Sequence, residues 1–324
     1  MPDMISLVTT VLNENNNLAD WLDGILSQTV LPEEIVIVDG GSKDGTWEML
    51  VEKSKQNSLL KIWQHHGNIS AGRNFAISKA AGDIIVVTDA GCTYDVNWFR
   101  KITEPILSGQ SSFVATGFGP WFKSNDNLLT RLIAASTIPA PFEFKRNWLP
   151  SSRSIAFKKE VWQQVDGYPE WIPLCEDVIF DLKIFKLSIK TEYIREPLVF
   201  WRPRTTLKSY FKQLSGYTRS EGHGKLWFKR QMTRYIFYSV NIILLYLSCK
   251  ASWLFAVMLL IAWLGYLRKF WKRWFVYSEK LSLVNKIVGF IFLPLIIVYG
   301  DVAKMCGWPV GVYERHAGKI KFEN

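Results

Sequence analysis

Acidic residues follow two apolar segments of this sequence, where a carboxylate could take part in chemistry. Asp89 comes just after Ile84–Val87, four β-branched residues between two glycines, and Asp39 follows the similar segment 35–38. Such segments are typical of strands that are buried on both faces of a sheet. Ligands bind outside the carboxyl ends of strands in open α/β sheets, so both carboxylates could face a substrate or a metal ion. Each could instead cap the turn that follows it.

Further carboxylates lie elsewhere in the chain. Glu14 stands in the polar segment 12–17, which follows an apolar strand pattern at 5–11. The adjacent pair Glu176 and Asp177 precedes another apolar segment, and a carboxylate there could accept a proton from a hydroxyl group as a general base. The same pair would also be favourable simply as acids in the first turn of a helix. The residues alone leave both interpretations open.

Strand and helix patterns alternate through the first hundred residues. Strands are predicted at 5–11, 35–38, 59–63 and 84–87, with helices at 18–26 and 70–80, the latter capped by Ser70. This alternation predicts an α/β fold with a mostly parallel sheet. Further on, the patterns predict helices at 98–107 and 128–138, a strand at 113–116 that ends at 117–120, and a short strand in the segment 151–157.

Several common sites are excluded by spacing. The glycines of 40–45 lack the G-x-G-x-x-G pattern of dinucleotide-binding turns, and no Gly-Lys-Ser/Thr of a phosphate-binding loop follows. The 4 cysteines form no C-x-x-C pair, and the 4 histidines have no zinc-ligand spacing. The cysteine pattern and the absence of a signal-like start lead us to expect the first half in a reducing cytoplasm.

Four ordered motifs resemble family 2 of the inverting glycosyltransferases. They lie at 10–14, 36–46, 71–74 and 82–89, and the resemblance covers roughly the first 225 residues. It implies a Rossmann-like GT-A domain that binds a nucleotide-sugar. The residues of these motifs that would bind the donor are Asn13, Glu14, Asp39, Arg73 and Asp89. Among them, Asp39 would contact the nucleobase.

The resemblance also implies roles in the reaction itself. Asp177 would be the catalytic base, and Glu176 would help to place the acceptor. The family usually has Asp-x-Asp after the central strand, whereas this chain has Asp89-Ala90-Gly91. A divalent cation, Mg²⁺ or Mn²⁺, would therefore be held by Asp89 alone, which Mg²⁺ tolerates when substrate phosphates supply further ligands. Arg219 is a further candidate for steadying the leaving diphosphate, but a basic helix lying against lipid headgroups would explain it equally well.

The C-terminal third is apolar. Lys250 is the single charged residue of 235–267, and basic residues crowd both flanks. A hairpin that turns near 248–250 would keep both flanks in the cytoplasm, as the positive-inside rule requires. A third segment, 287–302, either spans the membrane or lies in its interface, and a buried helical core is the alternative for all three. The net charge of +10 with a pI of about 9.3 favours anionic lipid over nucleic acid as the partner.

These observations predict a catalytic GT-A domain at 1–225, membrane-associated helices at 226–304 and a tail at 305–324. The expected protein is an inner-membrane glycosyltransferase with a cytoplasmic catalytic domain, which adds a sugar to a lipid-linked or cell-envelope glycan. The Gln-x-x-Arg-Trp motif of processive synthases is absent, which favours single additions. The alternatives are a polyprenyl-phosphate glycosyltransferase and a non-catalytic GT-A scaffold at the membrane.

Overall fold

The computed structural model describes residues 4–145 and 148–320, which divide into two compact units. The first unit comprises 4–121 and 141–202, and the second comprises 122–140 and 203–320. Residues 122–140 and 203–225, which the sequence placed in the catalytic domain, thus group with the long C-terminal helices. Residues 321–324 of the predicted tail lie outside the described residues.

The first unit is built on one sheet, in which we describe eight strands. They are β1 Ile5–Val11, β2 Glu34–Asp39, β3 Leu60–Gln64, β4 Ile84–Val87, β5 Cys92–Tyr94, β6 Phe113–Pro120, β7 Ile155–Lys158 and β8 Thr191–Trp201. Their spatial order is β3-β2-β1-β4-β7-β6-β8-β5. The first four in this order are parallel, β7 runs antiparallel to both its neighbours, and β5 runs antiparallel to β8. The predicted α/β fold with a parallel sheet is confirmed, and an antiparallel extension is added to it.

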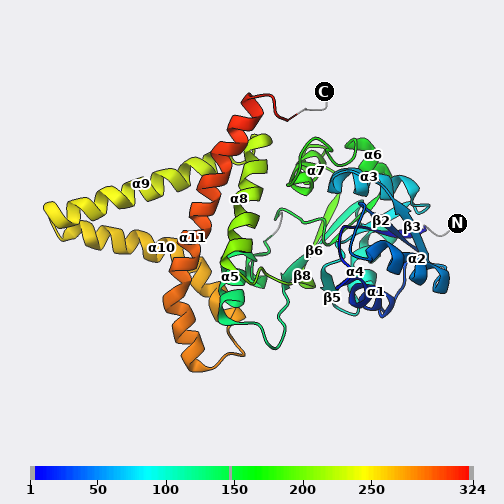
Figure 1. Cartoon of the computed structure of the whole chain (residues 1–324), viewed down its shortest axis with the longest axis horizontal. Helices are drawn as coiled ribbons and strands as arrows, with labels where there is room; N and C mark the ends of the chain where they lie inside the picture. The colour runs from blue at the N-terminus through cyan, green and yellow to red at the C-terminus, as the bar shows by residue number, and fades with distance from the viewer. Residues whose placement is uncertain (1–3, 146–147, 321–324) are drawn as a thin grey trace. The chain divides into compact units, whose positions relative to one another are not determined.

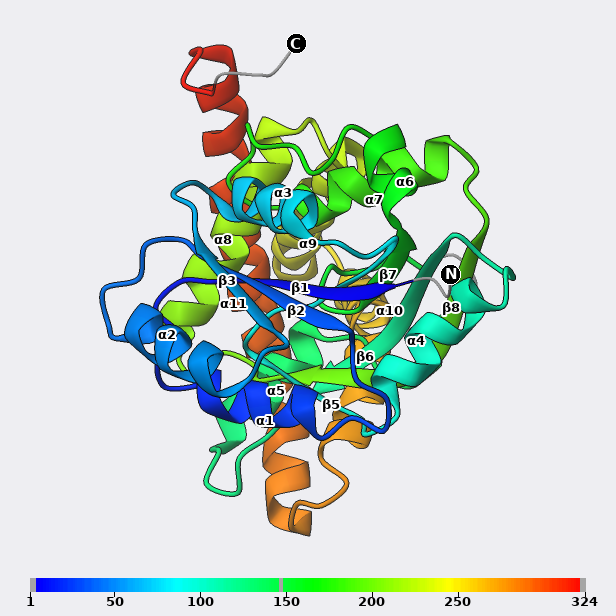
Figure 2. The same cartoon turned by 90° about the vertical axis from the view of Figure 1, so that its right-hand side faces the viewer.

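Helices cover both faces of this sheet (Figure 2). One face packs against α1 Leu18–Leu26, α2 Thr46–Gln56 and α4 Trp98–Leu107, and the other against α3 Ile69–Lys79, α6 Lys159–Gln164 and α7 Glu176–Lys186. Successive strand residues enter opposite cores, as Leu7 and Val8 of β1 do. The central strands are therefore fully buried, and only their carboxyl ends are available for a site.

Three local predictions need correction. Residues 117–120 do not end the strand, because β6 continues to Pro120 through register shifts at Gly117. The cap of α3 is Asn68, whose side chain accepts the backbone N–H of Ala71, and not Ser70, which is buried inside the helix. Strands β5 and β8 were not predicted, because β8 contains a proline and lacks strict alternation.

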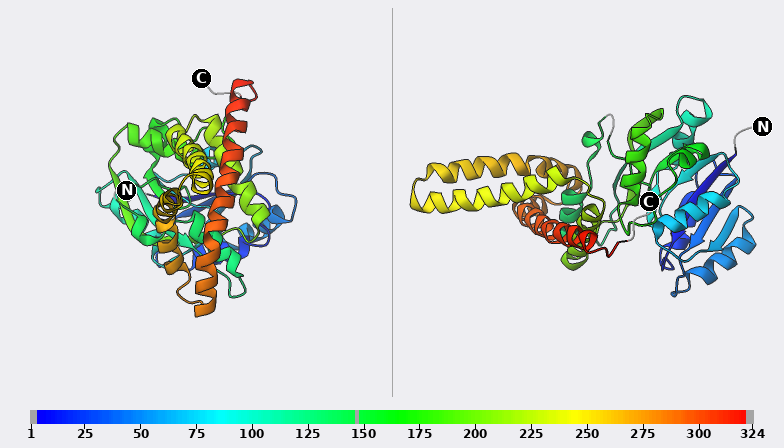
Figure 3. Two further views of the ribbon diagram at one scale, coloured as in Figure 1. Left: turned by 90° about the vertical axis from the view of Figure 1, so that its left-hand side faces the viewer. Right: turned by 90° about the horizontal axis from the view of Figure 1, so that it is seen from above.

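The second unit is helical. It contains α5 Leu128–Thr137, α8 Leu207–His223, α9 Phe228–Lys250, α10 Leu254–Tyr277 and α11 Leu283–His316. The hairpin of α9 and α10 turns at 251–253, and the two helices lie side by side (Figures 1 and 3). Gly307 and Gly311 of α11 face the backbone of α8 so closely that a Cβ atom would collide with it. These glycines let α11 pack directly along α8.

The long helices carry the apolar segments found in the sequence. Among the described residues, α9, α10 and α11 are long and apolar enough to cross a membrane, with mean hydropathies of 1.2, 1.5 and 2.0 over their most apolar stretches. Their apolar side chains are largely uncovered: Ile236, Ile261 and Leu295 are 62–63% exposed. Exposure of this extent in three adjacent helices indicates association with a membrane. The third helix is much longer than the predicted segment 287–302 and continues through Pro294 and Pro309.

The bulge of β6 generates a stability prediction. A Cβ atom at Gly117 would lie 2.5 Å from the carbonyl oxygen of Arg195 and 2.8 Å from that of Glu196, both backbone atoms. We expect Gly117→Ala to lower the free energy of unfolding by about 1–3 kcal/mol, because β6 and β8 must separate. Gly91→Ala is the matched control, since nothing lies within 4 Å of its Cβ position. Equal thermal midpoints for the two variants would contradict this account of the bulge.

Candidate active site

A buried arginine joins two of the predicted acidic positions. The guanidinium of Arg73, on α3, donates to Asp89 Oδ1 at 2.7 Å through Nη2 and to Glu176 Oε1 at 2.6 Å through Nη1. The side chain of Arg73 is 3% exposed. Asp89, after β4, and Glu176, at the start of α7, therefore share the guanidinium of one arginine, although they are far apart in sequence.

The motif 71–74 positions this arginine residue by residue. Gly72 lies against β1, where a Cβ atom would come within 2.9 Å of the Thr10 methyl group. Asn74 holds the following loop, since its Nδ2 donates to the Tyr168 carbonyl at 2.8 Å and its Oδ1 accepts the Tyr168 N–H at 2.9 Å. The Tyr168 ring in turn packs under Arg73, with 5.4 Å from guanidinium carbon to ring centroid. Gly72 and Asn74 thus both help to position Arg73.

A second arginine reaches the same carboxylate. Arg153, just before β7, places its Nε 3.3 Å from Asp89 Oδ2 and stacks on Trp201 at 4.5 Å. The sequence analysis noted the segment 151–157 as a strand and assigned no function to Arg153. The sequence feature that could have pointed to Arg153 is its position just before a strand. The structure shows that this strand pairs with β4. Both oxygens of Asp89 therefore face guanidinium groups.

The two carboxylates respond oppositely to this environment. Burial opposes ionisation of Asp89, but the charges of Arg73 and Arg153 outweigh it and hold its pKa below the usual carboxyl value. Burial dominates at Glu176, and with repulsion from Asp177 it raises the pKa of Glu176 despite the pairing with Arg73. Asp89 is thus the firmly ionised member of the cluster.

Asp177 follows Glu176 in the first turn of α7. It is partly exposed, and one of its oxygens accepts the N–H of Val178 at 2.9 Å. One turn further along, Asp181 is fully buried, and neither of its oxygens has a hydrogen-bond partner. Burial and the nearby Asp177 raise the pKa of Asp181 well above its usual value. Sequence analysis missed Asp181, which resembled an ordinary polar residue inside a helix.

The loops after β1, β2 and β3 interlock at the same edge of the sheet. Asn13 Oδ1 accepts the N–H of Lys43 at 2.9 Å, and its own N–H donates to Ser42 Oγ at 2.8 Å. Glu14 accepts from Asn17 Nδ2 at 2.9 Å. Gly41, at φ +95°, lies so close to His66 that a Cβ atom would be 2.5 Å from the imidazole. Asn13 and Glu14 are therefore part of a connected loop surface beside the Arg73 cluster.

Asp39 is fully buried inside this loop surface. Its Oδ2 accepts the N–H groups of Gly41 at 3.2 Å and Ser42 at 3.1 Å, and also Gln64 Nε2 at 3.1 Å. It therefore caps the turn after β2, which is the alternative role that the sequence left open for Asp39. Its strand lies two positions from β4, about 10 Å away at the usual strand spacing. A nucleobase contact by Asp39 remains a prediction.

Arg219 belongs to the second unit and is not brought into the Arg73 cluster by any contact that we describe. It lies on α8, where its Nε donates to Glu314 Oε2 of α11 at 2.6 Å. Its role in steadying a leaving diphosphate remains a prediction, and Arg153 is the arginine that contacts Asp89.

The residues do not form a site for a resident divalent cation. Both oxygens of Asp89 are occupied by guanidinium groups, and the second carboxylate of the family motif is replaced by Gly91. Within 4–145 and 148–320, no group of three or more His, Cys, Asp or Glu side chains could hold a metal ion. Any cation at Asp89 would need most of its ligands from a bound substrate.

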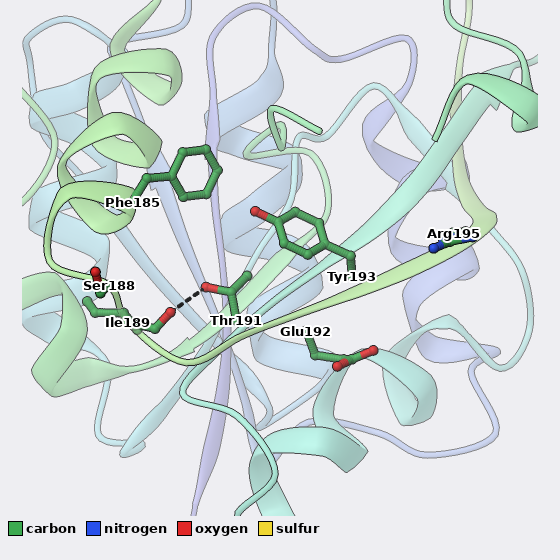
Figure 4. A pocket seen from close by; sticks show the side chains of 7 residues that line it. All are labelled: Phe185, Ser188, Ile189, Thr191, Glu192, Tyr193 and Arg195. Carbon is green, nitrogen blue, oxygen red and sulfur yellow. Dashed lines mark hydrogen bonds between the residues drawn. The ribbon is translucent and has the colours of Figure 1, made fainter. Parts of the chain in front are cut away.

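Another hollow in this unit is separate from the cluster. A cavity of about 690 Å³ lies between the end of α7 and the start of β8, lined by residues such as Phe185, Tyr193 and Arg195 (Figure 4). Thr191 donates to the Ile189 carbonyl at 2.9 Å within its wall. Phe185 stands two turns beyond Asp177, about 12 Å along the helix. This cavity is therefore not the candidate active site.

The pairing of Arg73 generates a second prediction. Lysine keeps the charge but cannot donate to two carboxylates from a planar fork, so Arg73→Lys should lower the free energy of unfolding by about 2–4 kcal/mol. Arg100→Lys is the matched control, since Arg100 makes an exposed pair with Glu104 at 3.8 Å, and it should change stability by less than about 0.5 kcal/mol. Denaturant unfolding measures both, and similar small losses would rule out a central role for Arg73.

The chain is similar in sequence to known proteins. Residues 6–159 match the family model described as glycosyl transferase family 2, which includes Arg73 and Asp89. The O-antigen chain rhamnosyltransferase RfbN of Salmonella typhimurium is 24% identical over 221 residues, covering 64% of this chain and 70% of that protein. The succinoglycan biosynthesis protein ExoA of Rhizobium meliloti is 24% identical over 222 residues, covering 66% of this chain and 67% of that protein. Across three of the curated relatives, the match spans from 31% to 70% of their length.

Among solved structures, S. aureus TarS 1–349 aligns with a TM-score of 0.49 at 15% identity, covering 99% of this chain and 97% of that one. Residues 6–159 of the chain match the sequence pattern of glycosyl transferase family 2, and three long apolar helices follow in the C-terminal part.

Proposed function

We propose that this protein is a membrane-attached inverting enzyme that transfers a sugar from a nucleotide-sugar to a lipid-linked or cell-envelope glycan. The single observation that carries the proposal is the Arg73 bridge between Asp89 and Glu176. It links the strand end that would meet the donor with the helix start that would meet the acceptor. Asp177, next to Glu176, would then lie where it can take the proton of the acceptor hydroxyl.

The reaction would be one in-line displacement. The acceptor hydroxyl oxygen forms a bond to the anomeric carbon while the bond from that carbon to the diphosphate oxygen breaks. The electron pair of that bond leaves with the nucleoside diphosphate, and the carboxylate of Asp177 takes the hydroxyl proton. Glu176 is a positioning residue in this scheme, since it is buried against Arg73 and holds the first turn of α7.

Positive charge for the leaving diphosphate would come from Arg153. The Arg153 side chain is 28% exposed and its guanidinium is stacked on Trp201, so the residue is both oriented and reachable by a ligand. A planar guanidinium can donate to two phosphate oxygens at once. Arg73, by contrast, is enclosed by its two carboxylates and would act by holding them in place.

A divalent cation, Mg²⁺ or Mn²⁺, is proposed to enter together with the donor. Arg73 and Arg153 balance Asp89 and Glu176 in charge, so a diphosphate brings uncompensated negative charge to the cluster. Its oxygens would also supply the ligands that the chain lacks around Asp89. In this proposal the cation binds together with the substrate.

The acceptor and the location rest on two further supports. The names of RfbN and ExoA refer to O-antigen and succinoglycan, both polysaccharides. Basic residues cluster at both ends of the apolar part of the α9–α10 hairpin, which favours a cytoplasmic position for both ends in the inner membrane. The domain limits 1–225, 226–304 and 305–324 stay as the functional division of the chain that we propose.

The base assignment is tested by Asp177→Asn. Removing the proton acceptor should lower kcat by at least about 100-fold and leave donor binding nearly unchanged. Asp20→Asn is the matched control, because Asp20 is an exposed acid in the first turn of α1. Transfer and hydrolysis of nucleotide-sugars by both variants are measured with purified full-length protein. Unchanged turnover in Asp177→Asn would show that this acid only favours the helix start.

The cation proposal is tested by donor affinity in Mg²⁺ and in EDTA. Mg²⁺ should tighten binding of the donor to the native protein, and Asp89→Asn should remove most of that difference. The matched control Arg100→Gln alters an exposed residue and should retain the full difference. If EDTA has no effect on the native protein, the arginines alone neutralise the diphosphate and the cation is not needed.

A further inference from the structure

The start of α11 is tied to α5. Tyr277 is the last residue of α10 and lies six positions before Leu283, where α11 begins. The Tyr277 carbonyl accepts an N–H from Nη1 of Arg131, on α5, at 2.9 Å, and the Tyr277 hydroxyl donates to the Pro139 carbonyl at 2.6 Å. Six residues span at most about 21 Å, so the start of α11 stays close to α5.

The end of α11 is tied to α8. Arg219 of α8 donates from Nε to Glu314 Oε2 at 2.6 Å, and His223 Nε2 lies 2.9 Å from the same oxygen. Nearer the middle of α11, Gly300 lies against Tyr210 of α8. The helix α8 therefore accompanies the C-terminal half of α11.

These two partner helices stay on one side of any membrane. In the sequence, α5 follows β6 after the segment 121–127, and α8 follows β8 after the segment 202–206. Segments of this length are too short to cross a hydrocarbon core of about 30 Å. Because β6 and β8 are strands of one sheet, α5 and α8 begin on the side where that sheet lies. Both ends of α11 are therefore held on the same side, whereas a single span has its ends on opposite sides.

The outer side of α8 is basic. Lys208, Lys212 and Arg219 are exposed and are spread over about three turns of the helix. Cations are costly in hydrocarbon, whereas water and anionic headgroups accommodate them. A membrane-spanning α11 would carry these three side chains toward the hydrocarbon, so α8 marks the water-facing side of α11.

The face of α11 opposite α8 is apolar and uncovered. Ile291 and Val302 lie nine residues before Gly300 and Gly311, which face α8, and nine residues make two and a half turns. Ile291 and Val302 therefore project away from α8, and they are 62% and 45% exposed. Within this unit, α8 lies on one side of α11 and the α9–α10 hairpin extends from the other (Figure 1).

The hairpin crosses α11 and does not run beside it. Tyr238 of α9 donates to Asp301 at 3.0 Å, and Trp274 of α10 donates from Nε1 to the Lys286 carbonyl at 3.0 Å. The view along the hairpin shows α9 and α10 end-on and α11 over its full length (Figure 3, left). A hairpin that enters a bilayer end-on therefore leaves α11 parallel to the bilayer surface.

The mean hydropathy of α11, which by itself favours a span, has another source. Leu293, Ile297 and Ala303 are buried inside the unit, so α11 is apolar on its covered side as well as on its exposed side. Ala303 packs in one cluster with Ile133 of α5 and Leu214 of α8. Much of the apolar character of α11 thus serves packing within the protein.

We propose that α11 is not a third span but lies in the plane of the membrane, with its uncovered face in the acyl chains of the lipid bilayer. The bilayer is the occupant of this face because the face points in the direction in which the apolar hairpin extends. The inference rests on the proposed membrane attachment and is independent of the reaction at Asp177. It places the end of α11 on the same side of the membrane as the catalytic sheet.

The depth of α11 in a bilayer tests the proposal. Single cysteines at Val284, Leu295 and Val302 carry a fluorophore, in full-length protein reconstituted into vesicles of phosphatidylethanolamine and phosphatidylglycerol. Lipids with a spin label at a shallow or a deep position quench the fluorophore and report its depth. The starting protein has its three cysteines that are not buried changed to serine, namely Cys175, Cys249 and Cys306.

We expect the same depth at all three positions of α11, because they share the uncovered face of a flat helix. A span would separate Val284 from Val302 by about 27 Å along the membrane normal. A fluorophore at Ile261 of the hairpin is the control, and it should lie deeper. A graded depth along α11 with Ile261 in the acyl chains would overturn the in-plane placement alone. Absence of quenching at Ile261 would overturn the membrane attachment as well.

The sides of the two ends give an independent measurement. Lys280→Cys and Ala317→Cys alter exposed positions just before and just after α11. In the same cysteine-depleted protein, a membrane-impermeant maleimide should label both from the same side of the membrane. Labelling from opposite sides would overturn the proposal. Asp177→Asn should leave this labelling unchanged, so that loss of transfer and misplacement of α11 are separately visible.

Discussion

The buried guanidinium of Arg73 is the interaction on which the catalytic unit depends. Arginine cannot lose its proton inside a protein, so its charge must be matched by carboxylates that stay in reach. Asp89 and Glu176 meet that need at 2.7 and 2.6 Å, and they thereby fix the end of β4 against the start of α7. Gly72 and the side-chain amide of Asn74 bring α3 close enough for this contact.

The same balance of charge bears on how a diphosphate would be received. Two guanidinium groups and two carboxylates cancel in charge within the cluster, and Asp177 adds a further negative charge at its edge. An incoming diphosphate cannot rely on unpaired arginine charge and must either share Arg153 with Asp89 or arrive with its own cation. The missing second aspartate of the family motif fits this picture, because another carboxylate would have made the cluster more negative.

Charge also distinguishes the helical unit from a simple anchor. Ionised groups within apolar helices are costly and mark positions with a function or a partner. Asp301 meets that cost through Arg234, Lys304 and two tyrosine hydroxyls.

Local patterns in the sequence determined most strands and helices of the first unit, the apolar helices, and the identity of the motifs, because burial periodicity and turn residues act over a few neighbours. Asp89 and Glu176 were recognised from such patterns, and Arg73 from the resemblance of the motif 71–74 to the family. Only the tertiary structure decided that Arg73 joins the other two, that Asp39 caps its own turn, and that Arg153 and Asp181 lie at the site. Contacts between residues as much as 103 positions apart depend on how whole helices pack on the sheet, which no local pattern encodes.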